Sequence, residues 1–206
     1  MILGIDTSIG TAVAVVDLDG AVRAEAASAD PRGHAEVIGT LIADALATAG
    51  VTPAEITHVA VGMGPGPFTG LRVGIAAARA FALGRGIPVV PVVSHDAAAL
   101  ARGDAAEPFA VVTDARRREV AFSVYAPGSQ PRRMRGPELA ARSGEVAIDG
   151  LVLAEEELTT AISAADLARV AAGRIAAGEQ DAAASEPLYL RAPDVTIPAA
   201  RKKVGA

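Results

Sequence analysis

The chain has 206 residues, of which 51% are hydrophobic and 21% charged; its net charge is −5 and it contains no cysteine. That length can bury one substantial core or two smaller lobes. The lack of cysteine excludes disulfides, thiolate nucleophiles and Cys-ligated zinc, and it fits a reducing compartment. The negative charge argues against a protein that grips nucleic acid by itself, because phosphate neutralisation supplies most of that affinity.

The sequence contains no apolar run of the length needed to cross a bilayer. The stretch from Met1 to Asp6 lacks the basic leader of a signal peptide and reaches an aspartate at once. We therefore expect a cytoplasmic protein with no membrane association.

The first half of the chain predicts short strands followed by alternating helices and strands. The expected elements are strands at 2–7, 11–17 and 21–26, a helix at 34–49 that Gly50 ends, a strand at 56–61, a helix at 69–84 and a strand at 88–93. The first three strands are joined so tightly that they must be antiparallel neighbours. This half predicts a mixed sheet with helices packed against it.

A second copy of the opening pattern follows about half a chain later. Strand, aspartate, tight turn and strand occur around Asp6 and again around Asp114, where strands are expected at 109–113 and 120–125. This internal duplication predicts an α/β fold of two similar lobes, residues 1–98 and 99–206. The second lobe is expected to be smaller and poorer in apolar residues, with a helix at 164–177. A closing segment at 186–191 could pack back on the first lobe.

The turn Asp6-Thr7-Ser8 has two interpretations of about equal weight. Its hydroxyls and the glycine that follows could present backbone N–H groups to a phosphate while the aspartate holds a hydrated magnesium ion. Alternatively, the three side chains only satisfy the turn backbone. A nucleotide clamp also needs a glycine-rich second loop, and the corresponding place holds three arginines, 116–118. Independent kinase or ATPase activity is therefore disfavoured.

The helix at 69–84 and its Gly/Pro-rich approach predict a docking surface. Thr69 is the expected N-cap, and the approach has neither a Walker lysine nor the spacing of a dinucleotide fingerprint. Between Gly70 and Gly84 only Arg72 and Arg79 are charged, so the helix should be buried nearly all round.

Small residues in this helix would let a partner helix approach closely, and the helix at 34–49 confines its polar residues to one line. The candidate interface comprises Glu36, Thr40, Gly70, Leu71, Arg72, Gly74, Ala77 and Phe81. Under this hypothesis a Gly74→Leu substitution abolishes association while the fold survives. The alternative is that both helices are ordinary core helices of an alanine-rich protein.

Other chemistry-bearing residues give weaker signals. The three histidines lack the spacing of metal ligands, so no metal site is expected, and no nucleophile elbow surrounds Ser8 or Ser94. Residues 99–145 carry 8 basic and 6 acidic side chains. This region, with Arg116, Arg117 and Arg118, could face tRNA within a larger assembly or form a solvated surface.

Five segments together resemble the TsaB (YeaZ) family in order and spacing. They are residues 5–8, 34–36, 64–74, 114–120 and 187–191. The block from Gly64 to Gly74 is the most specific of them; Pro67 stands where the family usually has serine, and the second lobe looks shorter than in many relatives.

The resemblance implies an actin-like (ASKHA, RNase H-like) fold of two lobes and a role in bacterial tRNA modification. Members of that family are non-catalytic subunits that pair with the larger paralogue TsaD, which transfers a threonylcarbamoyl group to the N6 of the adenosine beside the anticodon. The small ATPase TsaE joins the pair. The resemblance thus implies a TsaD-type heterodimer partner, a homodimer in isolation as an alternative, and tRNA reached through the complex. It also implies no cofactor of its own, with ATP or ADP and Mg²⁺ present only within the complex.

Overall fold

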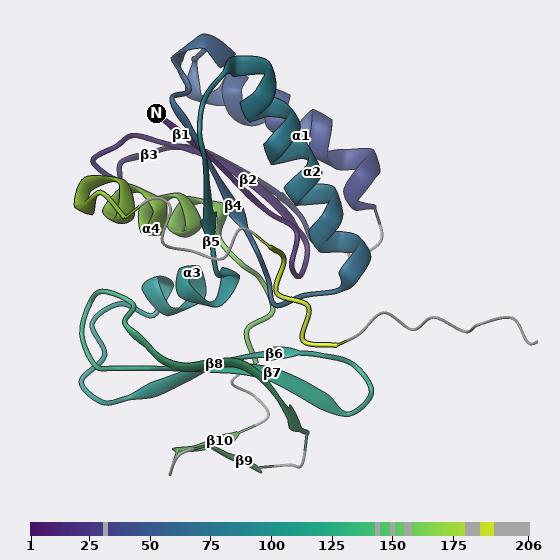
Figure 1. The fold of residues 1–206 in the computed structure, drawn as a ribbon, viewed down its shortest axis with the longest axis vertical. Coiled ribbons are helices and arrows are strands. Elements are labelled where there is room, and N and C mark those ends of the chain that lie inside the picture. The colour runs from purple at the N-terminus through teal and green to yellow at the C-terminus, as the bar shows by residue number, and fades with distance from the viewer. Residues whose placement is uncertain (31–32, 143–144, 149–150, 155–157, 180–185, 192–206) are drawn as a thin grey trace, which may run out of the picture.

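A computed structural model describes residues 1–30, 33–142, 145–148, 151–154, 158–179 and 186–191. It is an α/β structure of two lobes, one built on a five-stranded sheet and the other on a three-stranded sheet (Figure 1). The rest of the expected second lobe, including residues 192–206, lies outside the described residues.

The first sheet combines an antiparallel meander with two parallel strands. Its strands are β1 (Ile2–Asp6), β2 (Thr11–Val16), β3 (Val22–Ser28), β4 (His58–Gly62) and β5 (Val89–Val92). They lie in the order β3-β2-β1-β4-β5, with β1 antiparallel to β2 and parallel to β4. The short turns after β1 and β2 force the antiparallel pairs, and the helical crossovers after β3 and β4 allow the parallel ones. The expected mixed sheet is confirmed.

Two helices cover one face of this sheet. They are α1 (His34–Ala49) and α2 (Phe68–Arg85), and a 3-10 turn at Pro53–Glu55 precedes β4. Their buried residues share a core with Leu3 and Ile5 of β1. Gly50 ends α1 in the left-handed conformation with φ 66°, as expected.

The opposite face is covered by α4 (Ala164–Ala177), although the sequence analysis expected this helix in the second lobe. Its alanine-rich side packs on Ile2, Ala12 and neighbouring residues. At Gly4 the helix comes so close that a Cβ atom would collide with the carbonyl oxygen of Ala164. The fold thus returns to the first lobe after building the second.

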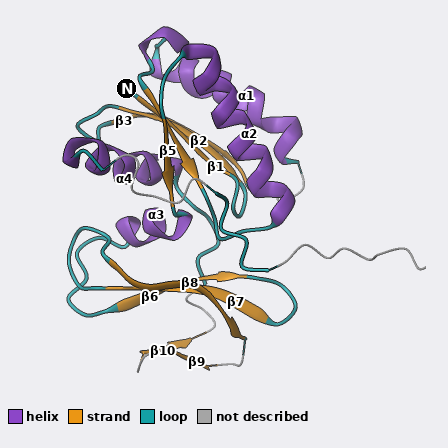
Figure 2. Cartoon of the chain, in the orientation of Figure 1, coloured by secondary structure: helices purple, strands orange, loops and turns teal. Residues whose placement is uncertain are grey.

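The second lobe is an antiparallel sheet. Its strands are β6 (Phe109–Asp114), β7 (Glu119–Tyr125) and β8 (Arg133–Ala141), with β9 (Glu145–Ile148) and β10 (Leu151–Ala154) as a separate hairpin. The described strands contain none of the parallel pairing expected of a mixed sheet, because no helical crossover separates them. Figure 2 shows that the helices gather around the first sheet, whereas the second lobe consists mainly of strands.

The short helix α3 (Ser94–Ala101) joins the lobes and was not expected from the sequence. It packs against both α4 and β6. Within the described residues, no helix has the length and apolar character that spanning a membrane requires.

Candidate functional site

A cleft of about 630 Å³ lies where the two lobes and the C-terminal segment meet. The first lobe contributes the β1–β2 turn and the start of α2, and the second lobe contributes the β6–β7 turn. The lining residues are Ser8, Ile9, His34, Pro65, Gly66, Pro67, Phe68, Thr69, Gly70, Thr113, Asp114, Ala115, Arg116, Arg117, Ala121, Leu139, Tyr189, Leu190 and Arg191.

The two turns that face this cleft are built alike. Asp6 pairs with Ala12 across the first hairpin, and Asp114 pairs with Val120 across the second. Each aspartate accepts a hydrogen bond from the backbone N–H two residues later, at 2.8 Å in the first turn and 3.3 Å in the second. The duplicated strand–aspartate–turn–strand pattern therefore has a structural counterpart.

Asp6 is buried, and both of its carboxylate oxygens are engaged inside the chain. Oδ1 accepts from the N–H and the hydroxyl of Ser8 at 2.8 and 2.5 Å, and Oδ2 accepts from the hydroxyl of Ser94 at 2.6 Å. Burial raises the pKa of Asp6, and the hydrogen bonds from Ser8 and Ser94 partly offset that rise. This carboxylate ties the β1–β2 turn to α3 and does not line the cleft.

Thr7 joins the same turn to α2. Its hydroxyl donates to the carbonyl oxygen of Gly70 at 2.8 Å. A Cβ atom at Gly74 would overlap Thr7 Oγ1, and one at Gly70 would stand 2.9 Å from His34 Nε2. Of the predicted trio Asp6, Thr7 and Ser8, only Ser8 lines the cleft. Phosphate binding by this turn stays a prediction.

These contacts correct part of the predicted interface. Gly70, Leu71 and Gly74 are buried within the chain itself, so they are not available to a partner. Their small size makes room for Thr7 and His34 and not for a second helix. The expectation that Gly74→Leu would leave the fold intact is wrong for the same reason.

The remaining predicted interface residues keep some exposure. Glu36, Thr40 and Arg72 are exposed, and Ala77 and Phe81 are half-buried. The exposed residues of α1 and α2 also include Asp44, Arg79 and Arg85. Small apolar residues lie among them, namely Ala35, Gly39, Ala43, Ala47, Ala76 and Ala80. Leu83 of α2 is 85% exposed, the highest value of any large hydrophobic residue in the described ranges.

Helix α2 begins one residue earlier than expected. Its N-cap is Pro67, and the backbone N–H of Leu71 donates to the carbonyl of Pro67 at 3.0 Å. Thr69 lies inside the first turn and is therefore not the N-cap, and no side chain makes a cap hydrogen bond to this helix start.

The β6–β7 turn holds three consecutive arginines in the left-handed backbone region. Arg116, Arg117 and Arg118 have φ angles of 61°, 55° and 59°. This conformation costs roughly 1–2 kcal/mol for each residue that has a Cβ atom. The absence of glycine was visible in the sequence, but the unusual backbone was not.

Arg191 of the C-terminal segment holds this turn. Its guanidinium donates to the carbonyl of Ala115 at 3.0 Å and to that of Arg116 at 3.4 Å, and it pairs with the carboxylate of Glu119. Because Arg191 satisfies two carbonyls and a carboxylate together, it stabilises the turn in one conformation.

The rest of segment 186–191 is fixed to the first lobe. Leu188 N–H donates to the carbonyl of Met63 at 2.8 Å. The Tyr189 ring contacts that of Phe68 with centroids 4.6 Å apart, and its hydroxyl accepts from Arg72 Nε at 3.1 Å. The segment therefore bridges both lobes beside the cleft (Figure 1).

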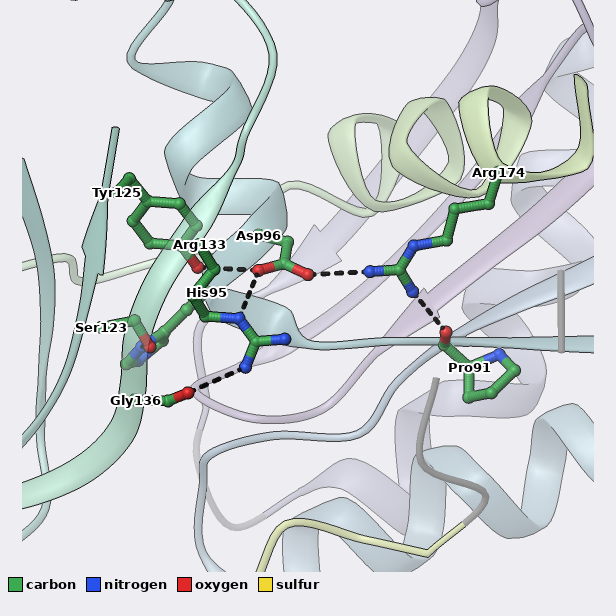
Figure 3. A network of polar contacts seen from close by, with 8 residues as sticks. All are labelled: Pro91, His95, Asp96, Ser123, Tyr125, Arg133, Gly136 and Arg174. Carbon is green, nitrogen blue, oxygen red and sulfur yellow. Dashed lines mark hydrogen bonds and ion pairs between the residues drawn. The ribbon is translucent and has the colours of Figure 1, made fainter. Parts of the chain in front are cut away.

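A buried polar network around α3 joins the two lobes. Figure 3 shows the Asp96 carboxylate of α3 between two arginines. It accepts from Arg174 of α4 at 2.9 Å, pairs with Arg133 of β8 at 3.3 Å and accepts from the Tyr125 hydroxyl of β7 at 2.8 Å. Burial, with the neighbouring Asp96 charge, raises the pKa of Tyr125, so the phenol stays a donor. Arg174 also donates to the carbonyl of Pro91.

The His95 ring forms a second set of polar contacts beside this network. Its Nδ1 and Nε2 lie 2.9 Å from Ser123 Oγ and 3.0 Å from Thr113 Oγ1. Burial and the Arg133 charge lower the pKa of His95 to about 3. Ser8 and Ser94 are both bound to Asp6 and not to His95, so the described structure assembles no hydrolase set from these residues.

The sequence reasoning missed this inter-lobe network. A weak signal existed: the polar run Ser94-His95-Asp96 directly follows an apolar strand and precedes an alanine-rich helix. Among the described residues, no group of three or more His, Cys, Asp or Glu side chains is placed to hold a metal ion.

Comparison with known proteins gives consistent results. The family described as TsaD, tRNA N6-adenosine threonylcarbamoyltransferase, matches residues 22–133. An uncharacterized protein of Mycobacterium tuberculosis is 39% identical over 201 residues, which cover 94% of this chain and 92% of that protein. The tRNA N6-adenosine threonylcarbamoyltransferase of Streptococcus pneumoniae is 47% identical over 77 residues, 37% of this chain and 23% of that enzyme.

The fold comparison covers nearly the whole chain. A Pseudomonas aeruginosa crystal structure, described as an uncharacterized protein with similarity to peptidase YEAZ, superposes with a TM-score of 0.74 at 27% identity. The superposition covers 92% of this chain and 99% of that one.

Proposed function

The chain belongs to the TsaD/YeaZ family, and from that premise we propose that it is a non-catalytic subunit of the tRNA N6-threonylcarbamoyladenosine system. In this role it binds and activates a larger catalytic paralogue of the TsaD type, together with a TsaE-type ATPase. The tRNA is reached through the complex, which works in the cytoplasm, and the chain has no cofactor of its own.

The non-catalytic part of the proposal rests mainly on the hydrogen bonds that already occupy the Asp6 carboxylate. A carboxylate whose two oxygens already accept three hydrogen bonds from Ser8 and Ser94 has little capacity left for a hydrated Mg²⁺. The facing turn presents arginines where a nucleotide clamp needs a close backbone.

The outer face of α1 and α2 supports the docking part. Exposed alanines and Gly39 lie there among charged residues such as Glu36 and Arg79, and Leu83 has 85% of its surface exposed. Exposed apolar surface of this kind marks protein–protein contact sites. The proposed occupant is the paralogue, with a second copy of this chain taking the same place when the paralogue is absent.

The test is co-elution of the full chain with its catalytic paralogue, followed by measurement of threonylcarbamoyladenosine in tRNA. We expect Leu83→Glu to abolish both, because it buries a charge in the interface, while far-UV circular dichroism stays unchanged. The matched control is Leu18→Glu, at a residue that is 50% exposed and lies outside these helices. Normal pairing by Leu83→Glu would refute the docking face.

Calorimetry with ATP and Mg²⁺ tests the non-catalytic part. We expect no micromolar binding by the isolated chain. Micromolar binding accompanied by turnover would instead favour a stand-alone kinase or ATPase with the same fold.

A further inference from the structure

The β6–β7 turn presents three arginines at the mouth of the inter-lobe cleft. We propose that Arg116, Arg117 and Arg118 form an RNA-binding element that contacts the phosphate backbone of the tRNA. The identity of the RNA as tRNA rests on the proposed function, whereas the contact itself rests on the geometry of the turn.

The side-chain ends of Arg116 and Arg118 are left available, whereas Arg117 has a contact within the chain. All three arginines are exposed, and the guanidinium groups of Arg116 and Arg118 make no hydrogen bond or ion pair within the described ranges. With Arg142 and Arg191 the region holds five arginines, against the two carboxylates of Asp114 and Glu119. The surface is locally basic although the chain as a whole is acidic, so it attracts polyanions at short range.

The backbone of the turn, in contrast, is held on both sides of Arg117. Asp114 accepts from Arg116 N–H, Arg191 donates to the carbonyls of Ala115 and Arg116, and Arg142 N–H donates to the carbonyl of Arg118 at 2.7 Å. The chain thus holds Arg116 and Arg118 by contacts to their backbone and leaves their side chains without a partner among the described residues. Strained backbone held in this way is typical of ligand-binding sites.

The direction of the side chains favours a polymer over a small anion. In a left-handed turn, successive side chains are rotated by about 100°, as in the mirror-image right-handed helix. Arg116 and Arg117 line the cleft, and Arg118 does not. A small anion in the cleft would meet Arg116 and Arg117 but not Arg118, whereas a nucleic-acid backbone presents successive phosphates that can reach all three.

The surroundings favour RNA over an acidic protein or a magnesium nucleotide. Phe68 and Tyr189 line the same cleft, packed on each other and with the Arg72 guanidinium 3.6 Å from the Phe68 centroid. Aromatic rings and arginine planes are the usual stacking partners of unstacked RNA bases. An acidic peptide would not need such rings. A magnesium nucleotide would need a carboxylate such as Asp6, whose oxygens are already bound to Ser8 and Ser94.

The test measures the salt dependence of tRNA binding, by fluorescence anisotropy with a labelled unmodified tRNA transcript. The full chain is used alone and in its reconstituted complex with the paralogue, between 50 and 200 mM KCl. For the double variant Arg116→Gly/Arg118→Gly, we expect the slope of log Kd against log salt to fall by about 1.4, two contacts at about 0.7 each. Wild-type affinity should therefore drop about sevenfold more than variant affinity across this range.

Two further variants separate charge from conformation. Glycine adopts positive φ without strain, so the midpoint of thermal unfolding of the double glycine variant should be no lower than that of the wild type. The double variant Arg116→Lys/Arg118→Lys retains the charges and should retain most of the slope. Arg135→Ala removes an exposed arginine of β8 that is paired with Glu138 at 2.8 Å, and it should leave the slope unchanged.

The outcomes are distinct from those that test the proposed function. If the glycine variant pairs normally with the paralogue but binds tRNA with the wild-type slope, the RNA contact is refuted and the docking role stands. If the variant no longer pairs with the paralogue, the arginines contact the partner protein. If the reconstituted complex loses only ATP binding, they contact a nucleotide. Either result overturns the proposal. If the wild-type chain fails to pair, binding to the isolated chain still decides whether the turn contacts RNA.

Discussion

At the residue scale, two glycines of α2 have opposite surroundings. Gly74 faces the β1–β2 turn, where a Cβ atom would overlap Thr7 Oγ1, whereas Gly84 has no atom within 4 Å of the position a Cβ would take. Both are helical, so both carry the same intrinsic cost of glycine in a helix. The difference between them is therefore a measure of packing against Thr7.

We expect Gly74→Ala to lower the free energy of unfolding by about 1–3 kcal/mol, because the added methyl must displace Thr7. Gly84→Ala should raise it by up to about 1 kcal/mol, since alanine favours the helix and meets no obstacle. Urea denaturation of the two variants gives both values. Equal effects of the two substitutions would contradict the close contact between α2 and Thr7.

His95 makes stability depend on pH. In the unfolded chain it takes up a proton near pH 6.5, but in the fold its pKa is about 3 because of burial and the Arg133 charge. Between these pH values the unfolded state binds more protons than the folded state. The contribution of neutral His95 to the free energy of unfolding is therefore complete above pH 6.5. It is lost by about 1.4 kcal/mol per pH unit as the pH falls toward 3.

Denaturation curves of wild type and His95→Gln at pH 7.5 and pH 5 should therefore differ. We expect the wild type to lose about 2 kcal/mol more than the variant over this interval. The comparison with the variant cancels the contribution of Asp6, whose raised pKa acts in the opposite direction. Parallel loss in both proteins would mean that His95 is protonated in the fold.

At the element scale, segment 186–191 connects two surfaces with different proposed roles. Through Tyr189 it contacts Arg72 on α2, and through Arg191 it holds the β6–β7 turn. A six-residue stretch without regular secondary structure has few internal hydrogen bonds, so its position depends on these contacts. Partner docking on α2 and RNA contact at the turn could therefore be coupled through this segment.

Arg191→Ala should loosen the β6–β7 turn. We expect amide hydrogen exchange at Ala115 and Glu119, whose N–H groups close the turn, to accelerate by about tenfold, which corresponds to about 1.4 kcal/mol. Arg169→Ala is the control, because Arg169 makes comparable contacts to Gly20 and Asp166 on the first lobe. Unchanged exchange at the turn would show that Arg191 does not hold it.

At the scale of the whole molecule, Asp96 fixes the lobes to each other. It bonds to Arg174 on the side of the first sheet and to Tyr125 and Arg133 on the second. The carboxylate is almost fully buried, with 5% of its side chain exposed. A buried ion pair that loses one partner leaves uncompensated charge, and the cost is far larger than at the surface.

Asp96→Asn should lower the free energy of unfolding by about 3 kcal/mol. It should also make α3, which joins the lobes, more sensitive to protease. Glu138→Gln, which breaks the exposed pair with Arg135, should cost less than about 1 kcal/mol. Chemical denaturation and limited proteolysis of both variants provide the measurement. Similar losses in the two would mean that Asp96 does not lock the lobes.

Local rules accounted for most of the secondary structure. The apolar runs at β1 and β2, the helical spacing in 34–49 and the ending at Gly50 predicted these elements nearly to the residue, because local sequence determines periodicity and caps. The short helix α3 and the strand β8 were not predicted. An eight-residue alanine-rich segment and a strand with arginines and a proline carry little periodic signal.

The sequence by itself determined the duplicated strand–aspartate–turn–strand pattern, the missing glycines of the second turn and the surplus of small apolar residues on α2. Only the tertiary structure decided which side of α2 is buried, because Gly70 and Gly74 suit a partner helix and the chain's own Thr7 equally well. The same holds for Asp6, whose partner Ser94 is 88 residues away. The periodicity of the sequence indicates which residues share a face, whereas long-range packing determines which part of the molecule that face contacts.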